Sequence, residues 1–137
     1  MTEVLFAPIR RMTLWIPGTG PSHDPERGHL FIILTDPCPA GMNLLVPVCS
    51  AGPKSDTTCL LGAGDHPFLK KKSFVAYHLL NTYAATPLVE QEQKKIIRCK
   101  GLLDEKIFAL VCSGVQTSRS SPPIYKRYFA EQTSPKK

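Results

Sequence analysis

The chain has 137 residues, the size of one domain, which argues against two independently folded domains. Hydrophobic residues make up 42% of the chain and charged residues 20%, an ordinary globular composition that argues against general disorder. Thirteen prolines and nine glycines interrupt long helices and favour short strands joined by turns. We therefore expect a mainly β fold with a carboxy-terminal helix, in the α+β class.

The formal net charge of +6 fits three explanations. An excess of lysine and arginine favours a phosphate-bearing partner such as nucleic acid, but it also suits an acidic protein partner or simple solubility. No apolar run approaches the roughly 18 residues of a membrane-spanning helix, and the amino terminus lacks the pattern of a signal peptide. The sequence thus predicts a soluble, cytoplasmic protein with no membrane partner.

Five cysteines are spread along the chain without C-x-x-C spacing. An odd number at irregular spacing is typical of reduced thiols in a cytosol, and it indicates neither a disulfide framework nor a recognisable zinc site. The sequence therefore predicts no metal site and no cofactor. Two alternatives with suitable residue types stay open: a cysteine nucleophile such as Cys49, and a zinc site from Cys59, His66 and His78.

Several short strands are expected in the amino-terminal half. Met12 to Pro17 has β-branched and aromatic content and ends at a proline, and Leu5 to Ile9 precedes it as a short edge piece. Gly18 to Gly28 is rich in turn formers and predicts a long surface loop. Leu30 to Thr35 and Asn43 to Ser50 are continuous apolar runs, which predict two buried strands paired as an antiparallel hairpin.

Two further strands are expected from Thr57 to Leu61 and from Ser73 to Leu79. Both faces of the second are partly apolar, since alternate residues on either side include large hydrophobic side chains. A strand that carries apolar residues on both faces is expected to be covered on both sides, either in a small barrel or between a sheet and a helix. We therefore expect four or five short strands to form a small antiparallel barrel.

The chain changes character after these strands. Ala84 to Gln93 is polar and contains a proline, which predicts a connection, and Lys94 to Lys100 either adds an edge strand or begins a helix. An apolar stripe with acidic residues near its start predicts a helix that ends near Gly114. The residues of the stripe are Leu103, Ile107, Leu110 and Val111.

A second short helix is expected from Ile124 to Glu131, because the prolines before it are tolerated at a first helical turn. The sequence thus predicts one domain over residues 1–131, with its helices at the carboxy terminus. Residues 132–137 are predicted to form a flexible basic tail.

The stretch from Asp56 to Tyr83 places a Gly-bounded turn and three lysines beside core-forming segments, and we expect the functional site there. Within it, Asp65 and His66 are adjacent. A carboxylate that orients an imidazole makes a general acid or base at neutral pH. The alternative is structural: Asp65 caps the turn and the ring of His66 packs under the residues that follow.

Lys70, Lys71 and Lys72 directly follow this turn, and they supply the positive charge that RNA phosphates need. Tyr77 is placed to stack on an unpaired base beside them. The alternatives are a solvated basic turn for the lysines and core packing for the tyrosine.

Ser50, Arg27 and His29 complete the set of predicted catalytic residues, together with His66 and Asp65. Ser50 follows the second buried strand, where a hydroxyl can bind phosphate or begin a turn. Arg27 and His29 flank the glycine at which the long loop enters the first buried strand, and together they can meet a phosphate. Ordinary surface exposure is the competing explanation.

The segments Thr13-Leu14-Trp15-Ile16-Pro17, Gly28-His29 before an apolar strand, and Leu45-Val46-Pro47-Val48-Cys49-Ser50 resemble the first half of the PemK/MazF family of bacterial toxins. This resemblance covers residues 12–50, and more loosely 57–83 and the final helix. It implies a small SH3-like antiparallel barrel of the CcdB/PemK superfamily that forms a homodimer. It also implies metal-independent cleavage of single-stranded RNA, and an antitoxin protein as partner.

One position departs from the family pattern. The family has an arginine that contacts the scissile phosphate directly after the Gly-His pair, and Leu30 stands there in this chain. Either Arg27 or His29 takes that role, or the cleavage chemistry is absent. The resemblance implies that Ser50 matches the family's hydroxyl residue. The alternative is a non-enzymatic SH3-like module that binds an acidic protein or nucleic acid.

Overall fold

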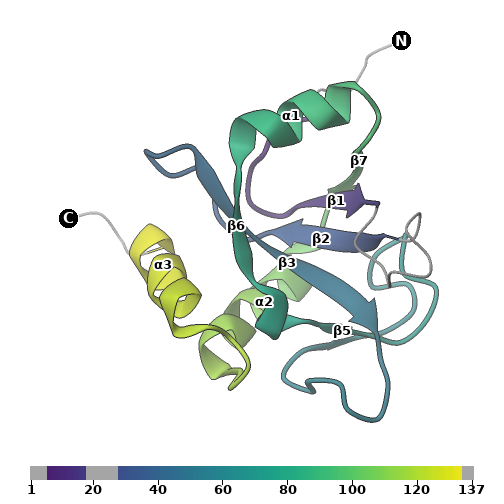
Figure 1. Cartoon of the computed structure of the whole chain (residues 1–137). Helices are drawn as coiled ribbons and strands as arrows, with labels where there is room; N and C mark the ends of the chain where they lie inside the picture. Colours follow the sequence, from purple (N-terminus) through teal and green to yellow (C-terminus); the bar gives the residue numbers. More distant parts are fainter. Residues whose placement is uncertain (1–5, 18–27, 134–137) are drawn as a thin grey trace.

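A computed structural model describes residues 6–17 and 28–133 of the chain (Figure 1). The predicted surface loop from Gly18 onward, with Arg27, lies outside the described residues except for Gly28, and so do residues 134–137 of the predicted tail. The other two tail residues, 132 and 133, belong to a helix. Residues 6–9 form no strand, so the edge piece predicted up to Ile9 is wrong in its described part.

Seven short strands form one antiparallel sheet in the described part of the chain. The order along the sheet is β4-β5-β3-β2-β1-β7, and β6 also pairs with β3. The strands are β1 (Met12–Ile16), β2 (His29–Ile33), β3 (Met42–Ser50), β4 (Leu60–Leu61), β5 (Ser73–Val75), β6 (Asn81–Ala84) and β7 (Arg98–Leu102).

The sheet is open. Among the described residues β4 and β7 are the two ends of the path and do not pair with each other, so the closed SH3-like barrel is not confirmed. The mainly antiparallel β architecture is confirmed, and so is the predicted hairpin of β2 and β3. The long strand β3 pairs with β6 through its first half and with β5 through its last residues, which allows the sheet to change direction along that strand.

Among residues 6–17 and 28–133, three α-helices accompany the sheet: α1 (Ala85–Gln93), α2 (Glu105–Thr117) and α3 (Pro123–Thr133). The two carboxy-terminal helices confirm the predictions, although α2 extends three residues beyond Gly114. Helix α2 begins where it does because the Asp104 carboxylate accepts hydrogen bonds from the amides of Lys106 and Ile107, at 3.0 and 3.2 Å. Leu110, which was assigned to the apolar stripe, is instead 62% exposed.

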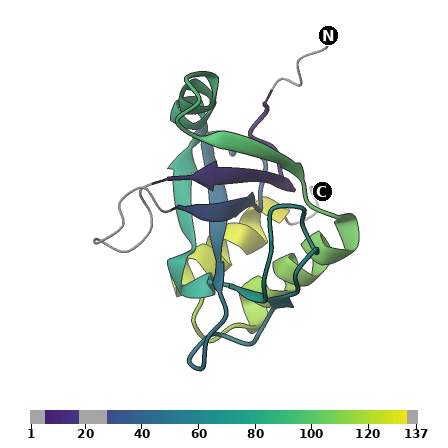
Figure 2. The ribbon, with the colours of Figure 1, turned by 90° about the vertical axis from the view of Figure 1, so that its right-hand side faces the viewer.

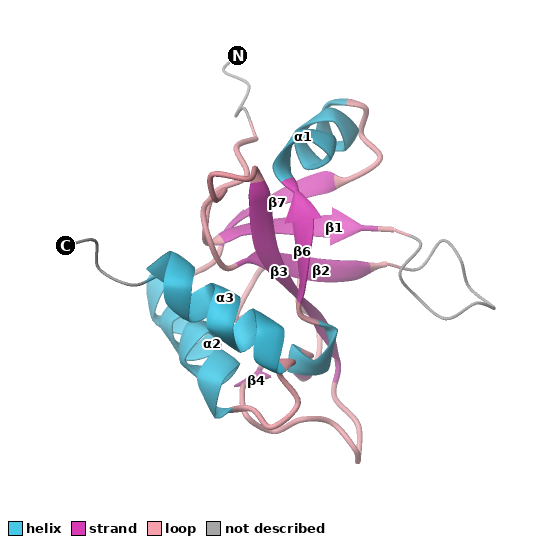
Figure 3. Ribbon diagram, turned by 60° about the vertical axis from the view of Figure 1, so that its left-hand side comes forward, coloured by secondary structure: helices cyan, strands magenta, loops and turns pink. Residues whose placement is uncertain are grey.

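The helices cover both faces of the sheet (Figure 3). Alternate residues of the central strands, among them Leu30, Ile32 and Val46, face the cluster that contains Val111 of α2 and Phe129 of α3. The residues between them point the other way, into a second cluster that includes Leu88 of α1. This division explains why β2 and most of β3 are continuous apolar runs, since each side of a strand has its own core to fill.

Two further segments differ from the sequence prediction. The connection predicted over Ala84 to Gln93 is helix α1, where Pro87 is tolerated because it lies in the first helical turn. The strand predicted from Ser73 to Leu79 ends at Val75, and the chain continues as the single 3₁₀ turn η1 (Tyr77–Leu79). Of the two alternatives for Lys94 to Lys100, the edge strand is correct, because β7 begins at Arg98.

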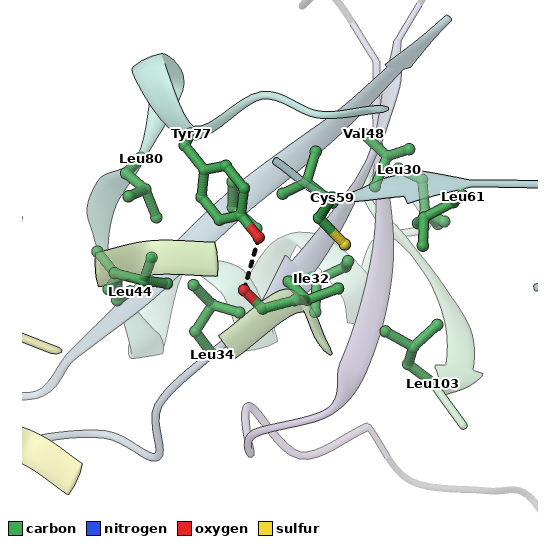
Figure 4. Packing of buried hydrophobic residues seen from close by; sticks show 14 of the residues in the cluster. Leu30, Ile32, Leu34, Leu44, Val48, Cys59, Leu61, Tyr77, Leu80 and Leu103 are labelled. Carbon is green, nitrogen blue, oxygen red and sulfur yellow. Dashed lines mark hydrogen bonds between the residues drawn. The ribbon is translucent and has the colours of Figure 1, made fainter. Parts of the chain in front are cut away.

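The η1 turn carries Tyr77 into the core (Figure 4). The side chain is fully buried, and its hydroxyl donates a 2.6 Å hydrogen bond to the carbonyl of Val111 in α2. A Cβ atom on Gly114 would lie 2.0 Å from this hydroxyl, so the helix needs glycine at that point. The prediction that Tyr77 stacks on RNA is wrong, because the tyrosine is part of the core.

Candidate nucleic-acid interface

A hollow of about 260 Å³ opens at one end of the inner strands of the sheet, where three segments distant in sequence meet. We call it the aromatic hollow. It combines the junction between β1 and β2, the end of β3, and the loop between β4 and β5. Its polar and aromatic lining consists of Trp15, His29, Ser50, Phe68, Lys70, Lys71 and Ser73; Gly28, Leu30, Val48, Cys49 and Leu69 complete it.

Two aromatic rings form one wall of the aromatic hollow. Trp15 on β1 and Phe68 on the loop lie with ring centroids 5.0 Å apart and planes tilted by 47°. Both rings are half-buried, so part of each faces solvent. The preceding strand residue, Leu14, is fully buried against α1, and the alternation of a strand therefore turns Trp15 to the opposite face of the sheet.

Positive charge surrounds these rings. The ammonium group of Lys100 on β7 lies 5.3 Å from the centroid of Phe68, within the range of a cation–π interaction. Lys70 and Lys71 line the hollow with exposed side chains, whereas Lys72 is exposed beside it. The backbone of the lysine run is held in place, because Ser73 Oγ donates to the carbonyl of Lys71 and the Ala51 amide donates to that of Lys72.

His66 does not line the aromatic hollow. It belongs to the loop between β4 and β5, drawn in dark teal in Figure 2, and its buried side chain contacts Thr13 of β1 and Lys100 of β7. The Nδ1 atom accepts a hydrogen bond from the amide of Phe68, at 3.0 Å. The Nε2 atom lies 3.0 Å from both Thr13 Oγ1 and the carbonyl oxygen of Lys100. We call these four residues the His66 network.

The partners of the ring fix its charge state. Since the Phe68 amide can only donate and the Lys100 carbonyl can only accept, the single ring proton is on Nε2 and the imidazole is neutral. The Thr13 hydroxyl donates to the carbonyl of Gly101 at 2.7 Å, which leaves its lone pairs to face the Nε2 proton. Burial lowers the pKa of His66 and keeps it neutral, although the hydrogen bond to Lys100 acts in the opposite direction.

The Asp65 carboxylate has a separate structural role. It accepts a 2.7 Å hydrogen bond from the amide of Gly62 and so caps the turn from Gly62 to Asp65. Asp65 is exposed, while His66 is bonded to other elements on the inside of the loop. The geometry therefore favours the structural alternative for this pair, and the hypothesis that Asp65 orients a catalytic His66 has no support from the contacts of either side chain.

Of the other three predicted catalytic residues, two line the aromatic hollow and one lies outside the described residues. His29 and Ser50 both line the aromatic hollow, on β2 and at the end of β3, together with Lys70 and Lys71. The junction before β2 is tight, since a Cβ atom on Gly28 would lie 2.2 Å from the carbonyl oxygen of Ile16. Arg27 lies outside the described residues. Of the two histidines predicted for the site, the structure places His29 in the hollow and leaves His66 out of it.

The structure argues against a nucleophile at Cys59 or Cys112, whereas Cys49 lines the aromatic hollow. Burial raises the pKa of Cys59 and raises that of Cys112 to about 11, so both thiols stay protonated at neutral pH. Within the described residues, no group of three or more histidine, cysteine, aspartate or glutamate side chains is arranged to hold a metal ion.

Trp15 and Phe68 were not predicted as site residues. The sequence signal that could have identified them is the position of the only tryptophan of the chain, near the end of a strand whose neighbouring residues face the core.

No protein-family model matches the sequence, and no match was found among curated proteins. None of the described helices has both the length and the apolar character needed to cross a membrane.

Proposed function

We propose that the aromatic hollow binds single-stranded RNA. The observation that supports this most is that one hollow combines a partly exposed Trp15–Phe68 pair with the cations of Lys70 and Lys71. A further cation, Lys100, lies over the Phe68 ring. Aromatic side chains stack on unpaired bases, and lysines beside them neutralise the phosphates that join those bases. A duplex has no free base faces to offer, so the single-stranded form is preferred.

RNA cleavage is the second candidate, and the presence of His29 and Ser50 in the same hollow favours it. In such a reaction His29 takes the proton of a ribose 2′-hydroxyl while the 2′-oxygen attacks the adjacent phosphorus. The bond from phosphorus to the 5′-oxygen breaks and leaves a 2′,3′-cyclic phosphate, and the 5′-oxygen takes up one proton to become a hydroxyl, which balances the proton that His29 removed and later releases. Lys70 and Lys71 stabilise the negative charge on the phosphorane, and no metal is required.

The resemblance to PemK/MazF toxins gives this proposal a biological setting. In that setting the chain is the toxin of a toxin–antitoxin pair, works in the cytoplasm as a homodimer, and adopts the family's SH3-like strand arrangement. Its antitoxin is a protein segment that covers the aromatic hollow. An acidic partner protein bound at the same lysines is the competing function, and it predicts binding without a contribution from the aromatic rings.

Trp15 provides a direct test, because it is the single tryptophan of the chain and lines the hollow. Titration with single-stranded RNA at low salt is expected to quench its fluorescence, and a duplex of the same length to quench it less. The double variant Lys70→Ala/Lys71→Ala should bind RNA about tenfold more weakly. The slope of the logarithm of the binding constant against the logarithm of the salt concentration should become shallower by about two units, one for each lysine removed.

A matched control is Lys106→Ala/Lys126→Ala, which removes the same charge from α2 and α3, outside the hollow. It should bind RNA nearly as the wild type does. Absence of both quenching and binding at low salt would overturn the proposal. Equal weakening by the two double variants would show that only net charge matters.

Cleavage is tested separately, with a long RNA in the presence of a chelator. His29→Ala should abolish cleavage, whereas His66→Gln should retain it as far as the variant stays folded. RNA bound but left intact by the wild type would remove the second candidate and leave the first. Cleavage that persists in His29→Ala would show that this histidine is not the base.

A further inference from the structure

A second and larger hollow, of about 480 Å³, lies beside the first one. We call it the basic hollow. Its charged lining comes from Lys54 and Asp56 on the loop after β3, His78 of η1 and Arg119 after α2. Phe74 of β5 lies at its border, and serine and threonine hydroxyls make up most of the remainder. Lys54, His78 and Arg119 are all exposed.

The two hollows are connected along the surface. A third hollow of about 420 Å³ shares Lys54, Ser55 and Phe74 with the basic hollow, and it shares Ser50 with the aromatic hollow. Phe74 lies between Ser73 and Val75, which are both buried, so its ring is turned to the outer side of β5 and is half-buried. The surface therefore runs from Trp15 past Ser50 and Phe74 to Arg119.

The carboxylate of Asp56 does not make the basic hollow acidic. Its oxygens already accept hydrogen bonds, from Thr58 at 2.9 Å and 2.6 Å and from the hydroxyl of Ser118 at 2.5 Å. Burial opposes its ionisation, but these bonds hold the pKa of Asp56 below its ordinary value. One negative charge thus faces the two positive charges of Lys54 and Arg119, so the charged lining of the basic hollow stays positive.

We infer that the basic hollow holds the phosphates of the same RNA strand that occupies the aromatic hollow, with Phe74 stacking on a base between them. This inference rests on the proposed function. It defines the substrate as an extended single strand rather than a mononucleotide or a dinucleotide. Surfaces that alternate cations with aromatic rings cover roughly 4 to 16 nucleotides in other single-strand binders, which sets the scale for the length of the strand.

The test compares RNA strands of about 4 and about 12 nucleotides, and the inference expects only the longer one to occupy both hollows at once. For the wild type, the longer strand should bind at least tenfold more tightly. Lys54→Ala/Arg119→Ala should remove most of that gain and weaken binding of the short strand no more than a control variant of equal charge does. The matched control Lys106→Ala/Arg127→Ala removes one lysine and one arginine that line neither hollow, and it should keep the gain.

Three outcomes would overturn the inference: no gain with length in the wild type, a gain that survives Lys54→Ala/Arg119→Ala, or an equal loss in the control variant. Each of them leaves the proposed function intact as long as the short strand still quenches Trp15. Failure of both strands to bind would instead overturn the proposed function itself. Circular dichroism of each variant excludes misfolding as the cause of a loss.

Discussion

The loop between β4 and β5 serves two regions of opposite character. Towards the inside it contributes His66, whose ring is 3% exposed and bonded to β1, β7 and the loop itself. Towards the outside it contributes Phe68, Lys70 and Lys71 to the aromatic hollow. The polar groups of the His66 network have their partners within the protein, whereas the lysines of the hollow point to solvent.

This contrast shows that polar residues adjacent in sequence need not belong to one site. The turn from His66 to Leu69 is closed by a 2.8 Å hydrogen bond between the Leu69 amide and the His66 carbonyl. It places the imidazole on one side of the loop and Phe68 beside Trp15. The His66 network thus holds in place the loop whose outer residues line the aromatic hollow. We therefore expect substitutions in the network to lower stability and substitutions in the hollow to lower RNA affinity.

The largest effect is expected from His66→Ala. The change removes a buried ring and leaves the Thr13 hydroxyl, the Lys100 carbonyl and the Phe68 amide without their present partner. We expect the free energy of unfolding to fall by about 3 kcal/mol, as measured by urea denaturation. The exposed His78 is the control, and His78→Ala should change stability by less than about 0.5 kcal/mol. Equal, small losses in both would mean that the network contributes little.

Phe68→Leu separates binding from stability. Leucine keeps an apolar contact with the core but cannot stack on a base, so we expect RNA affinity to fall about tenfold while stability falls by about 1 kcal/mol. Phe108→Leu is the matched control, since Phe108 also packs partly buried against the core but lies outside the hollow. If both leucine variants bind RNA as the wild type does, the stacking role of Phe68 is refuted.

The pH dependence of stability should distinguish the buried histidine. Because burial lowers the pKa of His66 in the folded protein, the unfolded chain binds a proton first as the pH falls through about 6.5. The free energy of unfolding should then decrease by up to about 1.4 kcal/mol per pH unit, until the folded protein is protonated as well. His66→Gln should lack this component below about pH 6.5. Parallel curves for the two proteins would contradict a lowered pKa.

Lys100 contributes to both regions through different atoms, and the smallest effect is expected there. Its carbonyl belongs to the His66 network and its ammonium group lies over Phe68. Lys100→Ala should therefore leave stability within about 0.5 kcal/mol, and weaken RNA binding about threefold with a shallower salt dependence. A loss of stability comparable to that of His66→Ala would show that the side chain, and not the carbonyl, supports the network.

Periodicity predicted much of the fold. The apolar runs of β2 and β3 indicated strands covered on both faces, and the stripe ending at Val111 indicated α2. Helix α1 was missed because its sequence is mostly polar and Leu88 is its one fully buried side chain. Helix α1 is held against the sheet because the preceding strand β6 pairs with β3. This pairing joins residues far apart in sequence, and a local sequence pattern does not predict it.

The site was predictable in outline only. The sequence singled out His29, Ser50, Lys70 and Lys71, and the structure brings these four residues together in one hollow, because loops at the ends of neighbouring strands lie close in space. Which way each loop side chain points depends on the hydrogen bonds of the turn, and these are not visible in the sequence. The choice between His66 and Phe68 for the hollow therefore required the structure.

Photo-crosslinking tests the central claim, that single-stranded RNA lies against Trp15 and Phe68, most directly. A strand that contains 4-thiouridine is bound to the full chain, irradiated and digested, and the crosslinked peptides are identified by mass spectrometry. We predict crosslinks at Trp15 and Phe68 that decline when unlabelled RNA competes. Crosslinks confined to α1 or α3, with none at these two residues, would contradict the account.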